Sequence, residues 1–336
     1  MGSNQLSNSK KCKIKLLQDL TKDSYSVYYF DNNFCVFKSI NAILYLIYPN
    51  IKNSIISFDL VNNKKIIEIK KAHEDYIMNF RHYLDSINRR DLIISISSRD
   101  RNIKIWDANN WMLLINIKVY NEGYLDSAYL LKDNNNNYII TCHENIRKEF
   151  CDSIKVLNFN KEEIKEIKDS NIKAFFIDAY YDINLNKIYI ITGNLGCVMS
   201  YDYYNNTVYH KYLDDNNEYH NSVLINSNGD IIKMIDSCVD GFVRIWSFHS
   251  GELLNKVKIS DDMLKGICMW HDFLFVACKQ IITIVNLKQE NIVNRIKAHQ
   301  SLVLTLKIIN HPSNGICLIS QGESVSPIKM WKIEEE

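Results

Sequence analysis

A short pattern recurs along this chain and constrains its fold more than any other feature. In its clearest copies, a turn containing Asp precedes alternating apolar residues that end in a tryptophan. These copies are SRDRNIKIWD at 98–107, SCVDGFVRIWS at 237–247 and, without the turn, IKMWK at 328–332. Four weaker copies place another bulky residue at the tryptophan position. The seven marker residues are Phe58, Trp106, Leu157, Tyr201, Trp246, Val285 and Trp331, spaced by 48, 51, 44, 45, 39 and 46 residues.

The segments between the markers predict β-strands. Short runs rich in Ile, Val, Phe and Tyr alternate with clusters of Asn and Asp. No stretch of about 12 residues shows the 3.6-residue period of an amphipathic helix. The segment KEEIKEIK at 161–168 has charge pairs suited to a helix but is too short to form one alone. Seven units of roughly 45 residues, each of about four strands, predict an all-β, seven-bladed β-propeller with four-stranded antiparallel blades.

These residues resemble the WD-repeat family, whose propellers include the G-protein β-subunits. In that family a His opens each unit and a Trp–Asp pair ends the third strand. The resemblance covers residues from about 12 to 333 and is specific in units two, five and seven, although no Gly precedes the His and Asp follows only Trp106. The matched pairs are His73 with Trp106, His220 with Trp246, and His299 with Trp331.

The resemblance implies a structural role for these side chains, in a buried hydrogen-bond chain from the His through a turn Asp and a strand Ser to the Trp indole. A buried indole or imidazole N–H left unpaired costs about 1–3 kcal/mol. The implied chains are His73, Asp100 and Trp106 in unit two, and His220, Asp240 and Trp246 in unit five. The serine position, about ten residues before the Trp, holds Ile96 and Asp236, with Ser97 and Ser237 one residue away. We therefore expect incomplete networks.

The resemblance also implies how the ring closes. The last unit supplies strands at 303–308, 316–320 and 328–333 but no fourth strand. The segment KCKIKLL at 11–17 alternates well and has no partner in unit one, so we expect it to complete blade seven and remove two sheet edges. The resulting divisions are a tail at 1–10, a single propeller at 11–333 and an acidic end at 334–336.

The net charge and the cysteine content limit which partners the protein can bind and in which cellular compartment we expect it. Lys and Arg number 40 against 39 Asp and Glu, a net charge of +1, which disfavours nucleic acid as the main ligand. No apolar run reaches the roughly 18 residues of a transmembrane segment. Nine cysteines without a C-x-x-C pair indicate reduced thiols. We expect the protein in the cytoplasm, with the nucleus as the alternative.

Sequence motifs that carry chemistry do not occur. The chain has no G-x-S-x-G elbow, P-loop, G-x-G-x-x-G turn or H-E-x-x-H pair. Cys142, His143 and Cys151 lack the spacing of common zinc sites and supply only three ligands. We therefore expect no catalytic residue, no metal and no cofactor, and we predict that the protein is not an enzyme.

Candidate partner-binding residues lie in turns between second and third strands, on the face that most often takes partners in the WD-repeat family. Unit three expands this turn to 143–152, and unit seven has a longer turn at 321–327. Unit two places two arginines in the turn with a tyrosine nearby, and both residue types are enriched at binding hot spots. The candidates are Tyr76, Arg99, Arg101, Glu144, Arg147, Lys148 and Glu149.

The expected function is a non-catalytic scaffold that binds other proteins or peptides on the loop face, as a monomeric propeller within a complex. Two alternatives stay open. One is a substrate receptor of a ubiquitin-ligase assembly, although Asn109, His249 and Glu334 stand where the docking motif Trp-Asp-x-Arg of such receptors needs arginine. The other is a propeller hydrolase whose site is assembled from distant loops.

Overall fold

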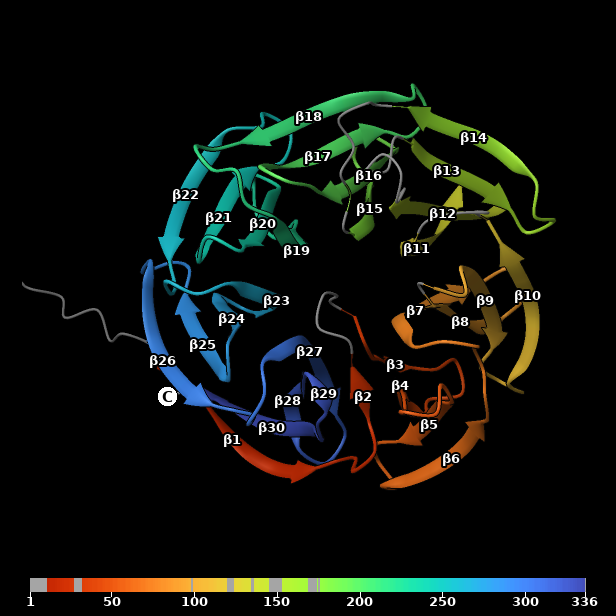
Figure 1. Cartoon of the computed structure of the whole chain (residues 1–336). Helices are drawn as coiled ribbons and strands as arrows, with labels where there is room; N and C mark the ends of the chain where they lie inside the picture. The colour runs from red at the N-terminus through yellow and green to blue at the C-terminus, as the bar shows by residue number, and fades with distance from the viewer. Residues whose placement is uncertain are drawn as a thin grey trace, which may run out of the picture.

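The propeller predicted from the sequence is confirmed. The computed structural model describes residues 11–26, 32–97, 99–119, 124–133, 136–144, 153–168, 174 and 176–335, with the backbone alone at 124, 126, 143 and 144. All regular structure within these residues is β-strand, so they contain no helix able to cross a bilayer. Seven four-stranded antiparallel sheets stand around a central axis (Figure 1).

In each blade the first strand lies nearest the axis and the last is outermost (Figure 1). Blade one contains β3 Cys35–Lys38, β4 Leu44–Pro49, β5 Ile55–Asp59 and β6 Lys64–Ile69. Blade two contains β7 Ile77–Asp85, β8 Arg90–Ser97, β9 Asn102–Asp107 and β10 Met112–Lys118. Blade three contains β11 Tyr124–Asp133, β12 Asn136–Glu144, β13 Ser153–Asn158 and β14 Glu163–Lys168. The charge pattern at 161–168 therefore belongs to an outer strand.

The next three blades repeat the arrangement. Blade four contains β15 Phe176–Asp182, β16 Lys187–Gly193, β17 Cys197–Asp202 and β18 Thr207–Leu213. Blade five contains β19 His220–Asn226, β20 Lys233–Cys238, β21 Phe242–Ser247 and β22 Leu253–Lys258. Blade six contains β23 Leu264–Trp270, β24 Phe273–Cys278, β25 Ile281–Asn286 and β26 Asn291–Lys297.

Blade seven joins the two ends of the described chain, as expected from the segment at 11–17. Its strands are β27 Val303–His311, β28 Gly315–Gly322, β30 Ile328–Glu335 and, outermost, β1 Cys12–Asp19. Cys12 pairs with Glu335 and Asp19 with Lys329. The strand β30 thus runs into the acidic end, where Glu334 faces Lys13.

A second contact, which the sequence did not predict, closes the same junction. The turn at 321–327 contains β29 Ser324–Val325, which pairs with β2 Tyr25–Ser26. Ser26 Oγ donates to the carbonyl oxygen of Gly322 at 2.5 Å, and Ser24 Oγ donates to that of Ser326. This longer turn of unit seven is therefore occupied by the chain itself.

The marker residues occupy equivalent places in the blades. Each lies on the third strand beside an irregularity in the pairing with the outermost strand. In blade two, Trp106 pairs with Leu113, and the register shifts before Ile115. A bulge adds a residue and increases the local twist, so each outer strand can follow a longer path than its inner neighbour. The spacing of the marker residues in the sequence is therefore the spacing of these bulged third strands from one blade to the next.

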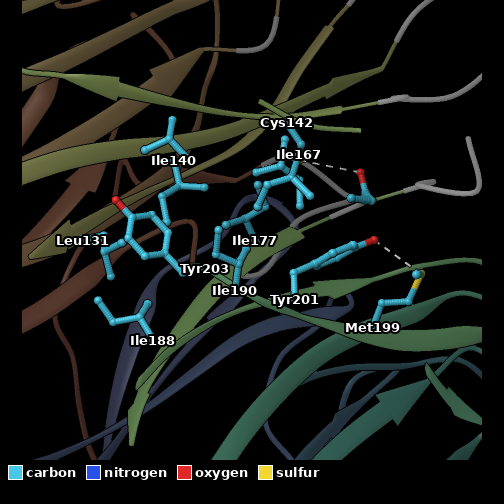
Figure 2. Close-up of a cluster of buried hydrophobic side chains, with 13 residues drawn as sticks. Leu131, Ile140, Cys142, Ile167, Ile177, Ile188, Ile190, Met199, Tyr201 and Tyr203 are labelled. Carbon is cyan, nitrogen blue, oxygen red and sulfur yellow. Dashed lines mark hydrogen bonds between the residues drawn. The ribbon is translucent and has the colours of Figure 1, made fainter. Parts of the chain in front are cut away.

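The hydrophobic core lies between neighbouring blades. Figure 2 shows one such cluster, in which Ile140 and Ile167 of blade three face Ile177 and Tyr201 of blade four. Sheets covered on both faces need apolar residues on both sides of each inner strand. This explains why the strands read as continuous runs of Ile, Val and Tyr rather than as strict alternation.

Candidate functional site

The residues that resemble the WD-repeat pattern form a complete network in blade two. Trp106 Nε1 donates to Ser95 Oγ at 2.9 Å, and Ser95 Oγ lies 2.8 Å from His73 Nε2. His73 Nδ1 lies 3.1 Å from Asp100 Oδ2, so a neutral imidazole protonated at Nδ1 satisfies every contact. The expectation of an incomplete network was wrong for blade two, because the serine stands eleven residues before the tryptophan, whereas in blade five the buried His220 Nε2 makes no hydrogen bond.

Blade seven repeats this network with one substitution. Ser320 Oγ accepts from Trp331 Nε1 at 2.8 Å and lies 2.8 Å from His299 Nε2. Ser326 Oγ, 3.1 Å from His299 Nδ1, takes the place of the turn aspartate. Burial lowers the pKa of His299 to about 3, and Lys329 adds to the shift. The imidazole is therefore neutral at physiological pH and acts as a structural side chain.

Blade five corrects the expected role of Asp240. Asp236, which is fully buried, accepts from Trp246 Nε1 at 2.5 Å and pairs with His220 Nδ1 at 2.7 Å. Asp240 instead binds the buried guanidinium of Arg244, whose Nη1 lies 3.1 Å from Asp240 Oδ1. A single carboxylate thus replaces the serine and holds both the His and the Trp.

The ring has two faces that differ in their connections. The blade-link face carries the segments between blades and the turns from second to third strands, and the hairpin face carries the turns from first to second and from third to fourth strands. Most partner candidates belong to the blade-link face. Glu144 is described by its backbone alone, and Arg147, Lys148 and Glu149 lie outside the described residues.

The structure brings the blade-two candidates near the closing segment. The ring of Tyr76 stacks on that of Tyr25, with centroids 4.9 Å apart, so one face of the ring contacts the chain's own β2. Arg99 is exposed, and its Nε lies 3.9 Å from Asp75 Oδ2. Arg101 adopts a positive φ of 59° at the end of its turn and is half-buried. Tyr76 and Arg99 therefore form a small exposed patch, with Arg101 in a structural position beside it.

The larger surface feature lies on the hairpin face and was missed from the sequence. A cavity of about 550 Å³ opens between blades three and four, and one of about 830 Å³ between blades four and five. Tyr181 lines both, so the two cavities adjoin at this side chain, and we call them together the tyrosine groove. Its smaller cavity is lined by Tyr83, Tyr129, Leu130, Leu131, Lys132, Asp133, Ala179, Tyr181, Asn186, Ile188 and Tyr204.

Three of the four tyrosines of the smaller cavity are held in place by hydrogen bonds. The hydroxyl of Tyr83 donates to Asn137 Oδ1 at 2.8 Å. The hydroxyl of Tyr181 donates to Asn186 Oδ1 at 2.7 Å, and that of Tyr204 to Asp133 Oδ1 at 2.8 Å. Burial and the bond to Asp133 raise the pKa of Tyr204 to about 12. Each of these three hydroxyls is a hydrogen-bond donor that anchors its ring.

Apolar side chains border the larger cavity and are unusually exposed. Ile183 is 77% exposed, and Tyr181, Leu185 and Ile231 are each a little more than half exposed. Asp182 Oδ1 accepts from the backbone N–H groups of Asn184 and Leu185 at 2.9 and 3.1 Å. This turn holds Ile183 and Leu185 outward although water surrounds them.

An imidazole braces the two blades beneath this turn. His249 Nε2 of blade five lies 2.8 Å from Asp182 Oδ2 of blade four. Tyr209 of blade four lies on the opposite side of the ring, with its hydroxyl 3.1 Å from His249 Nδ1. Both ring nitrogens thus have partners in the neighbouring blade, and the wall of the larger cavity is rigid.

One local signal could have revealed the groove. An Asp ends the first strand in blades two, three and four, namely Asp85, Asp133 and Asp182, and a tyrosine precedes it by one or two residues in blades two and four. In an inner strand this pattern places an aromatic ring at the hairpin face, where Tyr83 and Tyr181 line the smaller cavity. The remaining residues come from separate blades, so their proximity depends on the ring.

We looked for a metal-binding site and for a reactive thiol among the residues that the structure describes. Within it, no group of three or more His, Cys, Asp or Glu side chains is placed to hold a metal ion. Burial raises the pKa of the Cys238 thiol to about 12 and that of Cys317 to about 11. These two cysteines are protonated core residues.

Comparison with known proteins adds no relative. No protein-family model matches the chain, and no curated protein matches its sequence. The seven-bladed propeller is therefore shown by the structure alone.

Proposed function

We propose that the chain is a non-catalytic scaffold of the WD-repeat type that binds a partner protein or peptide in the tyrosine groove. The carrying observation is the set of exposed aromatic and aliphatic side chains along the groove, with Ile183 and Tyr181 at its centre. Contiguous exposed apolar surface with a polar border is typical of interaction sites. Tyrosine supplies a large contact area at a small cost in side-chain entropy.

The fixed side chains of the groove support binding to a preformed surface rather than folding upon binding. The tyrosine hydroxyls are anchored, and His249 braces blades four and five through Asp182 and Tyr209. A preformed surface loses little conformational entropy when a partner docks. The same contacts favour a structural role for His249, the histidine beside the larger cavity, because both of its ring nitrogens are engaged.

The test is an affinity capture from the native cell followed by mass spectrometry. The parent protein is compared with the double variant Tyr181→Ala/Ile183→Ala in the groove and with Arg99→Glu/Arg101→Glu on the blade-link face. We expect a stoichiometric partner that the groove variant loses and the arginine variant keeps. Leu254→Ala, on the exposed outer strand β22, controls for unspecific effects.

Two outcomes would contradict the proposal. A partner lost only by the arginine variant would move the binding site to the blade-link face. The absence of any reproducible partner, with all variants folded by circular dichroism, would oppose a scaffold and return attention to hydrolase screens.

A further inference from the structure

We infer that the tyrosine groove recognises a partner segment carrying a Lys or Arg, whose cationic side chain enters the smaller cavity between blades three and four. The inference rests on the proposed function and specifies its partner. Its basis is the combination of four tyrosines with a carboxylate in one cavity, namely Tyr83, Tyr129, Tyr181, Tyr204 and Asp133.

The face of an aromatic ring carries negative electrostatic potential, so a cation within about 6 Å of its centroid is attracted to it. The protein already uses this contact in the wall of the groove. The guanidinium carbon of Arg81 lies 4.9 Å from the ring centroid of Tyr129. On the neighbouring blade, Lys165 Nζ lies 4.1 Å from the centroid of Tyr203, the residue before Tyr204. Tyr129, which lines the smaller cavity, and Tyr203 beside it therefore already hold cations against their ring faces.

The protein's own cations beside the smaller cavity have polar partners of their own. Arg81 Nη2 donates to the carbonyl oxygen of Ile177 at 2.8 Å, and its Nη1 lies 3.4 Å from Asp178 Oδ2. Lys132 is the one Lys or Arg among the described residues that line the two cavities, and its Nζ donates to Ser86 Oγ of blade two at 2.9 Å. The positive groups of Arg81 and Lys132 are therefore both engaged in hydrogen bonds to other residues of the protein.

Carboxylates outnumber cations along the groove. Asp133 lines the smaller cavity, and Asp182 and Asp230 line the larger one. Asp133 accepts from the Tyr204 hydroxyl through Oδ1, which places its negative charge at the edge of a tyrosine ring. Electrostatic complementarity therefore favours a positive segment and disfavours an acidic one.

The larger cavity determines what flanks the cation. It shares Tyr181 with the smaller cavity and is lined by Ile183, Leu185 and Ile231, all exposed. An extended segment that places Lys or Arg among the tyrosines would therefore bring a neighbouring apolar side chain onto these residues. The recognised chemistry is a cationic residue beside an apolar one.

A peptide selection tests this without knowledge of the natural partner. A library of random 12-residue peptides displayed on phage is selected on the full-length protein, and enriched peptides are synthesised with a fluorescent label. We expect enriched sequences to contain Lys or Arg near an apolar residue. Replacing that Lys or Arg by norleucine should weaken binding at least tenfold by fluorescence anisotropy.

Protein variants locate the cation. Asp133→Asn keeps an acceptor for Tyr204 but removes the charge, so it should weaken the cationic peptide and leave the norleucine peptide unchanged, a coupling measured by a double-mutant cycle. Tyr181→Ala should weaken both peptides, and Leu254→Ala should weaken neither. Melting temperatures of all variants verify that they fold.

Each result has a distinct meaning. Groove-dependent peptides without Lys or Arg, or equal losses for both peptides in Asp133→Asn, would overturn the cationic inference and leave the proposed function standing. Enriched peptides that Tyr181→Ala does not weaken, or no enrichment at all, would overturn both.

Discussion

Asp236 in β20 and Ser95 in β8 occupy the same position in their sheets, each two residues beyond the backbone partner of a tryptophan. Met234 pairs with Trp246 and Ile93 with Trp106. The separation is ten residues in blade five and eleven in blade two, because the turn between the second and third strands is one residue shorter in blade five. Position in the sheet, rather than distance in the sequence, decides which side chain receives the indole N–H.

The carboxylate of Asp236 should be essential to blade five. Asp236→Ala leaves His220 Nδ1 and Trp246 Nε1 without their acceptor, and removing one partner of a buried charged network costs about 3–5 kcal/mol. Asp236→Asn keeps an acceptor and should cost less. The free energy of unfolding from urea titrations measures both, and equal losses in the two variants would refute the argument.

The tryptophan itself anchors the boundary between blades four and five. Trp246 is buried and its ring packs at 5.9 Å from that of Tyr212. Trp246→Ala should lower the free energy of unfolding by about 3–5 kcal/mol, as for other large buried aromatic residues. Trp111, which lies in the turn after the third strand β9 and is only partly buried, provides a comparison of equal chemistry; its alanine variant should lose less. A parent-like melting temperature for Trp246→Ala would be inconsistent with the described packing.

Stability should fall below neutral pH through buried histidines. Burial lowers the folded pKa of His299 to about 3, whereas the unfolded value is about 6.5. Between these values the unfolded chain binds a proton that the folded chain does not. The free energy of unfolding therefore decreases as the pH drops, by up to about 1.4 kcal/mol per pH unit. Burial also lowers the pKa values of His73 and His82, which act in the same direction.

Urea titrations between pH 7 and pH 5 measure this effect. His299→Asn, which removes the titrating group, should show a shallower dependence on pH than the parent even if it is less stable at pH 7. Identical slopes for variant and parent would show that His299 does not contribute.

Closure by β1 predicts a difference between two neighbouring side chains. Ile14 is buried against blades six and seven, whereas Leu17 on the same strand is more than one-third exposed. Ile14→Ala should lower the free energy of unfolding by about 2–4 kcal/mol, and Leu17→Ala by less than about 0.5 kcal/mol. Similar effects of the two variants in urea titrations would contradict the observed docking of β1.

The blades could be predicted from the sequence because the same packing requirement recurs in each of them. Trp106, Trp246 and Trp331 mark the third strand in three blades. Phe58 and Val285 occupy the same position in two others, since every blade must fill the same interblade space. The network members were harder to predict, because Ser95 and Asp236 are equivalent only once the turn length is known.

The groove could not be predicted in the same way. Tyr83, Tyr129 and Tyr204 belong to three different blades, and no local pattern states that the ring brings them around one cavity. The contact of Tyr76 with Tyr25 was missed for a similar reason, because it depends on the closing segment that follows β1.

The closure of blade seven has a consequence for the nascent chain during its synthesis on the ribosome. Ser24 and Ser326 form a hydrogen bond across 302 residues of sequence. The strand β1 pairs with β30, which is separated from it by a similar length of chain and is synthesised last. At about 5–20 residues per second, translation leaves β1 without its strand partner for roughly 15–60 s. During that time Lys13 and Lys15 keep this strand charged, and lysines on an open edge discourage pairing with neighbouring nascent chains.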